Sequence, residues 1–364
     1  MRCDTKVRCE RNPSGCAISG ILNKKGKRID GTKIIKSITL MHDRSNGLGG
    51  GFAAYGIYPR YKDYYAFHVM FDDEDCKARL EELLAERFII EKDEKIPTAK
   101  VANIHDPPLL WRYFVKVDDS KLDGMPEDDY VVDQIMDVNS NLAGAFISSS
   151  GKNMGGFKGV GYPEDIAKFF KLDGYKAYLW TAHGRFPTNT PGWWGGAHPI
   201  ALLDWSVVHN GEISSYGINK RYLEMFGYKL ELLTDTEVIA YLFDLLIRRH
   251  KLPVEIATGA LAPPFWKDID RMPAQKRKVY EAIRMVYGSA LMNGPFSIIV
   301  GCNKGMIGLN DRIKLRPMIA ATKDDFLYMS SEEAGIRIIE PEPDRVWAPK
   351  AGTPVIGLVE EDVE

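Results

Sequence analysis

Residues 16–22 read Cys-Ala-Ile-Ser-Gly-Ile-Leu, a short apolar stretch that follows a polar segment at the start of the chain. That segment ends in Asn12-Pro-Ser-Gly15, which is a run of turn-forming residues. A short apolar run that follows turn residues is typical of a buried strand. We therefore expect residues 1–15 to form an exposed tail or turn and Cys16 to open the first strand.

Two roles for Cys16 are open from the residues around it. A free cysteine is most often a small buried core residue. If the chain is cut between Gly15 and Cys16, however, the cysteine carries a free α-amine, whose pKa is about 8. Such an amine can act as the general base for the side chain of the same residue.

The rest of the chain alternates irregularly between helical and strand patterns, which favours a layered α+β fold. No repeat or clear linker divides it, so residues 16–364 read as one domain. Helical patterns cover residues 31–42, 73–88, 127–138, 163–171 and 274–290, and one follows a capping box at Thr234–Glu237. Strand patterns cover residues 52–57, 64–71, 111–117, 175–183 and 205–209, with several more between 296 and 358.

Polar residues that could take part in binding or catalysis follow two of the expected strands. Arg185, in the segment His183-Gly-Arg-Phe-Pro-Thr-Asn-Thr190, offers a planar fork suited to a carboxylate, although a surface salt bridge is the alternative. Asn210-Gly211 ends another strand. Asn-Gly is a strong signal for a tight turn. The same pair can also form an oxyanion hole from the Asn amide and the Gly N–H.

Asp235 and the glycines at 47–51 each have a structural and a functional interpretation. Asp235 stands in the first turn of a helix, where it either stabilises the helix dipole or holds a cationic amine. Residues 47–51 read Gly-Leu-Gly-Gly-Gly, but they match neither nucleotide-binding glycine pattern. Close approach of the backbone to a neighbouring element is the better reason for these glycines.

Composition excludes several classes of protein. The 364 residues carry 48 Lys and Arg against 50 Asp and Glu, a net charge of −2 that is unlike a dedicated nucleic-acid binder. No apolar run approaches the roughly 18 residues that span a bilayer. The polar N-terminus is unlike a secretory signal peptide, so we expect a cytoplasmic protein.

The cysteine pattern is unusual, because three of the five cysteines (Cys3, Cys9 and Cys16) fall in the first sixteen residues. No CxxC pair points to structural zinc, and no HExxH motif is present. We therefore expect no metal site. If residues 1–15 are removed, Cys3 and Cys9 leave with them and Cys16 becomes the first residue.

Taken together, these segments resemble class II glutamine amidotransferases, most closely the amidotransferase domain of glutamate synthase. Cys16–Ile21, His183–Thr190, His209–Glu212 and Thr234–Glu237 are similar to family motifs in order and spacing. Further similar segments are Trp193, Ala197–Pro199, Asn293–Pro295, Asp311-Arg312, Leu315–Pro317 and Ser331-Glu332. The resemblance runs from Cys16 to about residue 335.

The resemblance implies an N-terminal-nucleophile hydrolase fold, a four-layer αββα sandwich. It also implies a glutaminase site. Cys16 is the nucleophile that forms a thioester with L-glutamine, and Asn210 and Gly211 hold the oxyanion. Arg185 binds the substrate α-carboxylate, Asp235 binds its α-amine, and Thr188 helps to position it.

Two departures from the family matter. Cys16 is not at position 1 or 2, so the implied chemistry requires loss of residues 1–15, which the resemblance identifies as a propeptide. Ala17 stands where the family often has Gly. Residues 58–140 also form a longer segment than the simplest members carry, and the sequence assigns it no function.

The resemblance also bears on partners. No iron–sulfur cysteine pattern follows the N-terminus, and we expect no flavin-binding barrel. FMN and an iron–sulfur cluster are therefore expected only on a partner, a synthase subunit that makes glutamate from 2-oxoglutarate during nitrogen assimilation. Two alternatives stay open: a different ammonia acceptor, or an unprocessed, non-catalytic subunit that binds glutamine for regulation.

Overall fold

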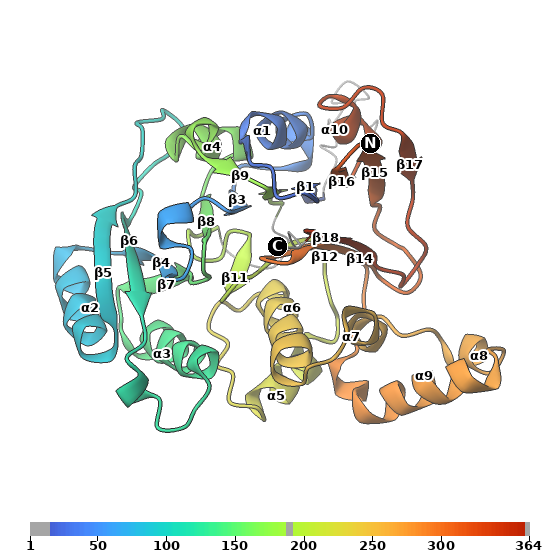
Figure 1. Cartoon of the computed structure of the whole chain (residues 1–364). Helices are drawn as coiled ribbons and strands as arrows, with labels where there is room; N and C mark the ends of the chain where they lie inside the picture. The colour runs from blue at the N-terminus through green and yellow to red at the C-terminus, as the bar shows by residue number, and fades with distance from the viewer. Residues whose placement is uncertain (1–14, 187–191, 361–364) are drawn as a thin grey trace, which may run out of the picture.

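Two antiparallel sheets lie face to face at the centre of the protein (Figure 1). The computed structural model describes residues 15–186 and 192–360. In these residues the first sheet has seven strands in the order β17-β15-β16-β1-β10-β3-β8. Their bounds are Arg345–Trp347, Ile319–Lys323, Phe326–Ser330, Ala17–Asn23, Leu179–Gly184, Gly50–Tyr55 and Met154–Gly159.

The second sheet has five strands within the described residues, in the order β11-β12-β13-β14-β18. Their bounds are Ile200–Leu202, Trp205–Gly211, Phe296–Cys302, Gly305–Asn310 and Val355–Leu358. Strands β1 and β10 of the first sheet face β12 and β13 of the second. The expected strand at residues 16–22 is therefore central in its sheet and has the other sheet on one face.

Helices cover the outer face of each sheet (Figure 1). On the first sheet these are α1 (Thr32–Thr39), α4 (Pro163–Phe169) and α10 (Glu333–Arg337). On the second side lie α5 (Tyr216–Glu224), α6 (Asp235–Phe243) and α7 (Val254–Leu261). The order helix, sheet, sheet, helix confirms the expected αββα fold class.

The core between the sheets explains why the first strand reads as an unbroken apolar run. Ile18 and Leu22 of β1 pack in one cluster with Val208 and Ile299 of the second sheet. The other face of β1 is covered by α1, so neither face meets water. A strand buried on both faces shows no polar alternation. Gly20 allows the sheets to approach closely, because a Cβ there would lie 2.6 Å from Met306 Sδ.

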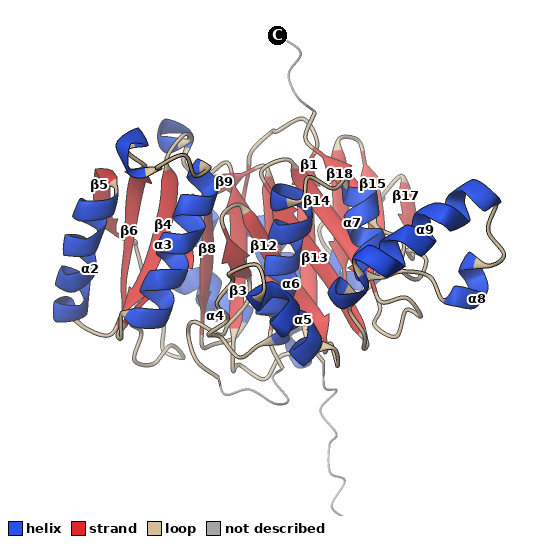
Figure 2. Cartoon of the chain, turned by 90° about the horizontal axis from the view of Figure 1, so that it is seen from below, coloured by secondary structure: helices blue, strands red, loops and turns tan. Residues whose placement is uncertain are grey.

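A third sheet accounts for the long segment 58–140. Its four strands within the described residues run β5-β6-β4-β7, and helices α2 and α3 pack on it (Figures 1 and 2). The bounds of these strands, in the same order, are Ile89–Lys95, Leu109–Lys116, Tyr65–Phe71 and Ala145–Ser149. Helix α2 spans Glu74–Arg87 and helix α3 spans Glu127–Asn141. Buried His68 joins this sheet to the first one through a contact of 3.1 Å between its Nδ1 and the Gly156 carbonyl.

Most expected elements are present, with changes at their ends. The strand expected at 175–183 is split into β9 (Lys176–Ala177) and β10. The helix expected at 274–290 is α9 (Ala274–Val286), which ends four residues earlier than expected. The long helix after Glu237 continues from α6 into a π-helical segment, Asp244–Arg249. In the described ranges no helix is long and apolar enough to cross a membrane.

The capping box expected at Thr234–Glu237 forms only in part. Thr234 caps α6 by accepting a hydrogen bond from the Thr236 N–H, as expected. The Glu237 carboxylate, however, accepts from the backbone N–H groups of Glu231 and Leu232 instead of that of Thr234. Glu237 thus holds the chain that leads into α6, which a local capping pattern cannot predict.

Candidate active site

Strand pairing brings the first candidate residues to one end of the first sheet. In the antiparallel pair β1–β10, Ala17 lies opposite Gly184 and Ile18 lies opposite His183. Cys16 precedes β1 and Arg185 follows β10, so the two residues are neighbours although 169 positions separate them. The site therefore begins as the meeting of one strand start with one strand end.

Contacts with the backbone of Phe186 and with the side chain of Arg44 hold Cys16. Its Sγ accepts a hydrogen bond from the Phe186 N–H at 3.4 Å. Its carbonyl oxygen accepts one from Nε of Arg44 at 3.2 Å, and Arg44 is itself fixed by Glu332 at 2.8 Å. Both the thiol and the main chain of Cys16 are therefore held in place.

The environment of the Cys16 thiol acts on its pKa in two directions. Burial raises the pKa, whereas the Phe186 N–H and the charges of Arg185 and Arg316 lower it. The net effect is a pKa above the usual value. Because only the thiolate is a strong nucleophile, a thiol in this state needs a base close by.

Arg185 is 4% exposed and lies beside the glycine-rich stretch. Its N–H donates to the Gly49 carbonyl at 2.8 Å, and a Cβ on Gly49 would lie 2.8 Å from Cδ of Arg185. At Gly51 a Cβ would lie 2.2 Å from the His198 carbonyl. The expectation that these glycines permit close approach is confirmed, and the arginine is buried rather than on the surface.

Asn210 and Gly211 form no turn. Both lie in β12, where they pair with Ser297 and Phe296 of β13. Asn210 is fully buried, its Nδ2 lies 3.4 Å from Ser331 Oγ, and its Oδ1 has no partner. The turn interpretation is therefore wrong, because the chain continues past Gly211 without reversing into a neighbouring strand.

Position 211 has no room for a side chain. Its φ is +140°, and a Cβ would lie 2.0 Å from the Pro295 carbonyl oxygen. Few L-residues adopt that backbone conformation, and none fits the space. The geometry thus exposes the backbone at the end of β12 without a side chain in the way.

Asp235 is the first residue of α6 and points back toward the end of β12. Its Oδ2 accepts from the Ile213 N–H at 2.8 Å, and its Oδ1 lies 3.6 Å from His209 Nδ1. Burial raises the pKa of this carboxyl, but His209 and the Ile213 N–H outweigh that effect and leave the pKa lowered. Asp235 is therefore an anion near neutral pH, and its charge acts on both Cys16 and Arg185.

Three buried histidines, His183, His198 and His209, lie behind these residues. The ring nitrogens of His183 and His198 are 3.1 Å apart, and Nε2 of His183 contacts the His209 carbonyl at 2.9 Å. Burial lowers the pKa of His183 to about 3, so it stays neutral. No group of three or more potential metal ligands occurs in the described part of the chain.

Sequence reasoning named Ser331 only as part of a segment similar to the family and gave it no role, and it did not single out Lys158. Ser331 Oγ accepts from the Ile18 N–H at 3.1 Å and contacts Asn210, so it links the nucleophile's strand to the end of β12. Lys158 of β8 is fully buried and donates to the Gly195 carbonyl at 2.8 Å. Only a lysine within an otherwise apolar and glycine-rich strand marks Lys158 in the sequence.

Lys158 gives a pH-dependent prediction. Burial lowers its pKa to about 7 from an ordinary value of 10.5. The unfolded chain thus binds more protons between these values, and the free energy of unfolding should rise with pH from about 7 to about 10.5. Lys158→Met should flatten this rise, as measured by urea unfolding at pH 8 to 10. Parallel curves for both proteins would contradict it.

The structure thus brings together Cys16, Arg185, Asn210, Gly211 and Asp235. Arg185 and Asp235 act on the thiol through their charges, and Asn210 reaches the same region through Ser331. Thr188 and residues 1–14 lie outside the described residues.

A family model described as "Glutamine amidotransferases class-II" matches residues 100–350. The chain belongs to this family. The match spans more than half of the sequence and includes Arg185, Asn210, Gly211 and Asp235. The αββα layers described above are those expected for a class II glutamine amidotransferase.

Individual relatives of this amidotransferase differ in how much they share with it. A protein of Archaeoglobus fulgidus described as uncharacterized is 54% identical over 98% of this chain and 96% of its own length. The glutamate synthase [NADPH] large chain of Bacillus subtilis is 29% identical over 52% of this chain, but only 13% of its own length is matched. The amidophosphoribosyltransferase of Methanocaldococcus jannaschii is 24% identical over 54% of this chain and 36% of its own.

Proposed function

We propose that this protein hydrolyses L-glutamine to glutamate and ammonia through a thioester on Cys16. The observation that carries the proposal is the convergence of a partly exposed cysteine, a buried arginine and an ionised aspartate at one end of two packed sheets. Residues 16–364 are proposed as one amidotransferase domain and residues 1–15 as a propeptide.

The charges in the site complement glutamine. Glutamine is a zwitterion that carries an amide at the far end of its side chain. In the proposed complex, the Arg185 guanidinium pairs with the α-carboxylate and the Asp235 carboxylate holds the α-ammonium group. Thr188 is proposed to help position the substrate. These contacts would place the amide carbon next to Cys16 Sγ.

The first half of the reaction releases ammonia. The α-amine of a processed Cys16 takes the thiol proton, and the sulfur forms a bond to the amide carbon. Negative charge develops on the amide oxygen, where the Asn210 side-chain amide and the Gly211 N–H stabilise it. The C–N bond then breaks as the α-ammonium group returns its proton to the leaving nitrogen.

The second half regenerates the enzyme. Water attacks the thioester carbon, the α-amine removes the proton from that water, and the C–S bond breaks to release glutamate. The thiolate regains a proton from the same ammonium group. The reaction consumes one glutamine and one water and releases one glutamate and one ammonia, so atoms and charge balance.

Glutamate synthesis is the proposed use of the ammonia. The match to a glutamate synthase large chain supports a synthase subunit as the partner. We propose that this partner acts on 2-oxoglutarate and that both proteins are cytoplasmic. FMN and an iron–sulfur cluster are proposed on that partner and not on this chain. The match to an amidophosphoribosyltransferase keeps a different ammonia acceptor as the second candidate.

The test compares two forms of the protein, one made from Met1 and one prepared with Cys16 as the first residue. Intact mass and N-terminal sequencing of the protein from native cells show which form exists, and a glutaminase assay measures both. We expect turnover only where Cys16 carries a free α-amine. A stable start at Met1 in native cells, or no turnover by the form that starts at Cys16, would overturn the proposal.

Asp235→Asn should raise the KM for glutamine by about 10- to 100-fold and change kcat much less, because it removes one charge-assisted contact to the substrate. Steady-state glutaminase kinetics measure the effect. Glu255→Gln is the control, since Glu255 is an exposed acidic residue in the first turn of α7. Equal effects of the two variants would indicate a helix-dipole role for Asp235 instead.

A further inference from the structure

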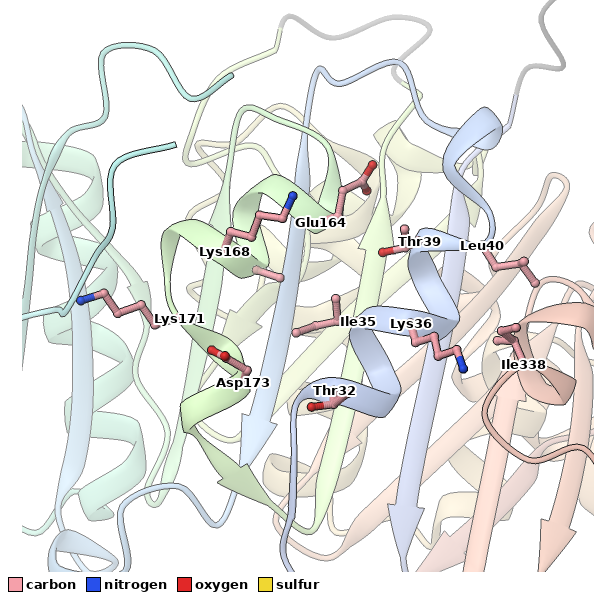
Figure 3. A pocket seen from close by; sticks show the side chains of 11 residues that line it. Thr32, Ile35, Lys36, Thr39, Leu40, Glu164, Lys168, Lys171, Asp173 and Ile338 are labelled. Atoms are coloured by element: carbon pink, nitrogen blue, oxygen red, sulfur yellow. The ribbon is translucent and has the colours of Figure 1, made fainter. Parts of the chain in front are cut away.

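A cleft of about 880 Å³ lies between α1 and α4, on the outer face of the helices that cover the first sheet (Figure 3). Ile35, Ala167 and Ile338 give it an apolar lining. Its volume is within the range of small-molecule sites, about 300–1,000 Å³. None of the proposed catalytic residues lines it, so the cleft is separate from the glutaminase site.

Two polar atoms on the wall of the cleft are buried without a hydrogen-bond partner. They are Oε2 of Glu164 and Oγ1 of Thr39. The other carboxylate oxygen of Glu164 is taken, because it lies 2.5 Å from Nδ1 of His42. Since nearly all buried polar atoms have partners, and an ionised carboxylate only accepts, Oε2 is available to accept from a donor that enters the cleft.

A cation stands next to this carboxylate. Lys168 follows Glu164 by four positions on α4, and such residues are neighbours on a helix surface. Other Glu and Lys pairs with this spacing form ion pairs in the structure, whereas within the described residues Lys168 has none, with Glu164 or any other group. Figure 3 shows both side chains on the cleft side of α4.

Lys36, Lys171 and Asp173 also line the cleft, but Glu164 and Lys168 are the opposite charges that stand one turn apart on α4. An acceptor for ammonium and a donor for carboxylate beside apolar residues match the two charged groups and the side chain of an amino acid. We propose that this cleft binds a free α-amino acid with a large apolar side chain. The ammonium group donates to Glu164 Oε2, the carboxylate pairs with Lys168 Nζ, and the side chain lies against Ile35 and Ala167.

The cleft is connected to the nucleophile through few contacts. Glu164 holds His42, which begins the short helical turn His42–Arg44, and Arg44 at its end donates to the Cys16 carbonyl. His42 also stacks on Tyr162, with ring centroids 4.1 Å apart. An ammonium group on Oε2 draws negative charge away from Oε1 and so weakens the contact between Glu164 and His42. This shifts the turn and weakens the hydrogen bond from Arg44 to the Cys16 carbonyl. The occupied cleft thereby lowers glutamine turnover.

Calorimetric titration of L-phenylalanine into the full chain tests the binding site. We expect saturable binding that weakens about tenfold in Glu164→Gln and in Lys168→Met, but not in the exposed control Lys350→Met. Because the Lys168 side chain is exposed, its variant should fold normally. Phenylethylamine, which lacks the carboxylate, should distinguish wild type from Glu164→Gln only. 3-Phenylpropanoate, which lacks the amine, should distinguish wild type from Lys168→Met only.

No saturable binding up to about 10 mM, or equal affinity in wild type and both cleft variants, would overturn the proposed site. The predicted effect of the ligand on turnover rests on the proposed glutaminase function, whereas the binding measured by calorimetry is independent of it. L-Phenylalanine should lower kcat about fivefold in the form that starts at Cys16, and His42→Ala should bind it without this response. An undiminished response in His42→Ala would overturn the route through Arg44.

Discussion

Cys16→Ala is expected to abolish glutamine hydrolysis, with kcat falling on the order of 10⁴-fold or more in the form whose first residue is position 16. No other described residue can supply the sulfur that forms the thioester, because the remaining described cysteines, Cys76 and Cys302, are buried in the hydrophobic core. The measurement is ammonia release under saturating glutamine. Unchanged turnover would remove Cys16 from the mechanism.

Three controls separate loss of the nucleophile from loss of structure. Cys76→Ala and Cys302→Ala should retain turnover, since Cys76 lies in α2 and Cys302 lies beside the start of β12, at the opposite end of that strand from Asn210 and Gly211. Cys16→Ala should unfold at nearly the same temperature as wild type, because it removes one sulfur from a partly exposed position. A glutamine analogue with an electrophilic side chain should add one equivalent of mass to wild type and none to Cys16→Ala.

Gly211→Ala is expected to reduce both turnover and stability. A Cβ at this position lies 2.0 Å from the Pro295 carbonyl oxygen, and φ is +140°, so β12 must shift away from the start of β13. The Gly211 N–H then leaves the proposed oxyanion hole, and loss of one such donor costs about 100- to 1,000-fold in kcat. Steady-state kinetics and thermal unfolding measure the two effects.

A second glycine provides a matched control for this substitution. Gly227 also has a positive φ, +87°, but nothing lies within 4 Å of a Cβ built there. Gly227→Ala therefore carries the backbone strain without the collision, and we expect it to lose some stability but no turnover. If Gly211→Ala keeps full turnover while Asn210→Ala does not, the N–H of Gly211 is not an oxyanion donor.

Local sequence patterns predicted the helices and strands whose apolar residues follow a regular pattern. Helix α2 and strand β4 lie within a residue of the expected ranges. The apolar residues of α2 recur at helical spacing, and β4 is a short apolar run that is buried along its whole length. The same reasoning failed at Glu237, whose carboxylate binds N–H groups five and six positions back instead of the helix cap. It also read Asn210-Gly211 as a possible turn, although β13 pairs with both residues.

The candidate site shows the same division. The residue types and their order along the chain pointed to Cys16, Arg185, Asn210, Gly211 and Asp235, and the family match supports the class of protein. The sequence could not indicate Ser331 as the link between Asn210 and β1, or Lys158 as a buried amine, because both depend on contacts between distant strands. The assignments for Thr188 and residues 1–15 stay predictions.

By itself, then, the sequence determined the layered fold, the family and the kinds of side chain available for glutamine. Only the tertiary structure decided which of these side chains meet, since strand pairing places Cys16 beside Arg185 and the start of α6 aims Asp235 at the same place. It also decided their ionisation: burial raises the pKa of the Cys16 thiol, whereas His209 and a backbone N–H keep Asp235 charged. The physical reason is that burial and charge depend on every layer packed around a residue, and a local pattern records only one of them.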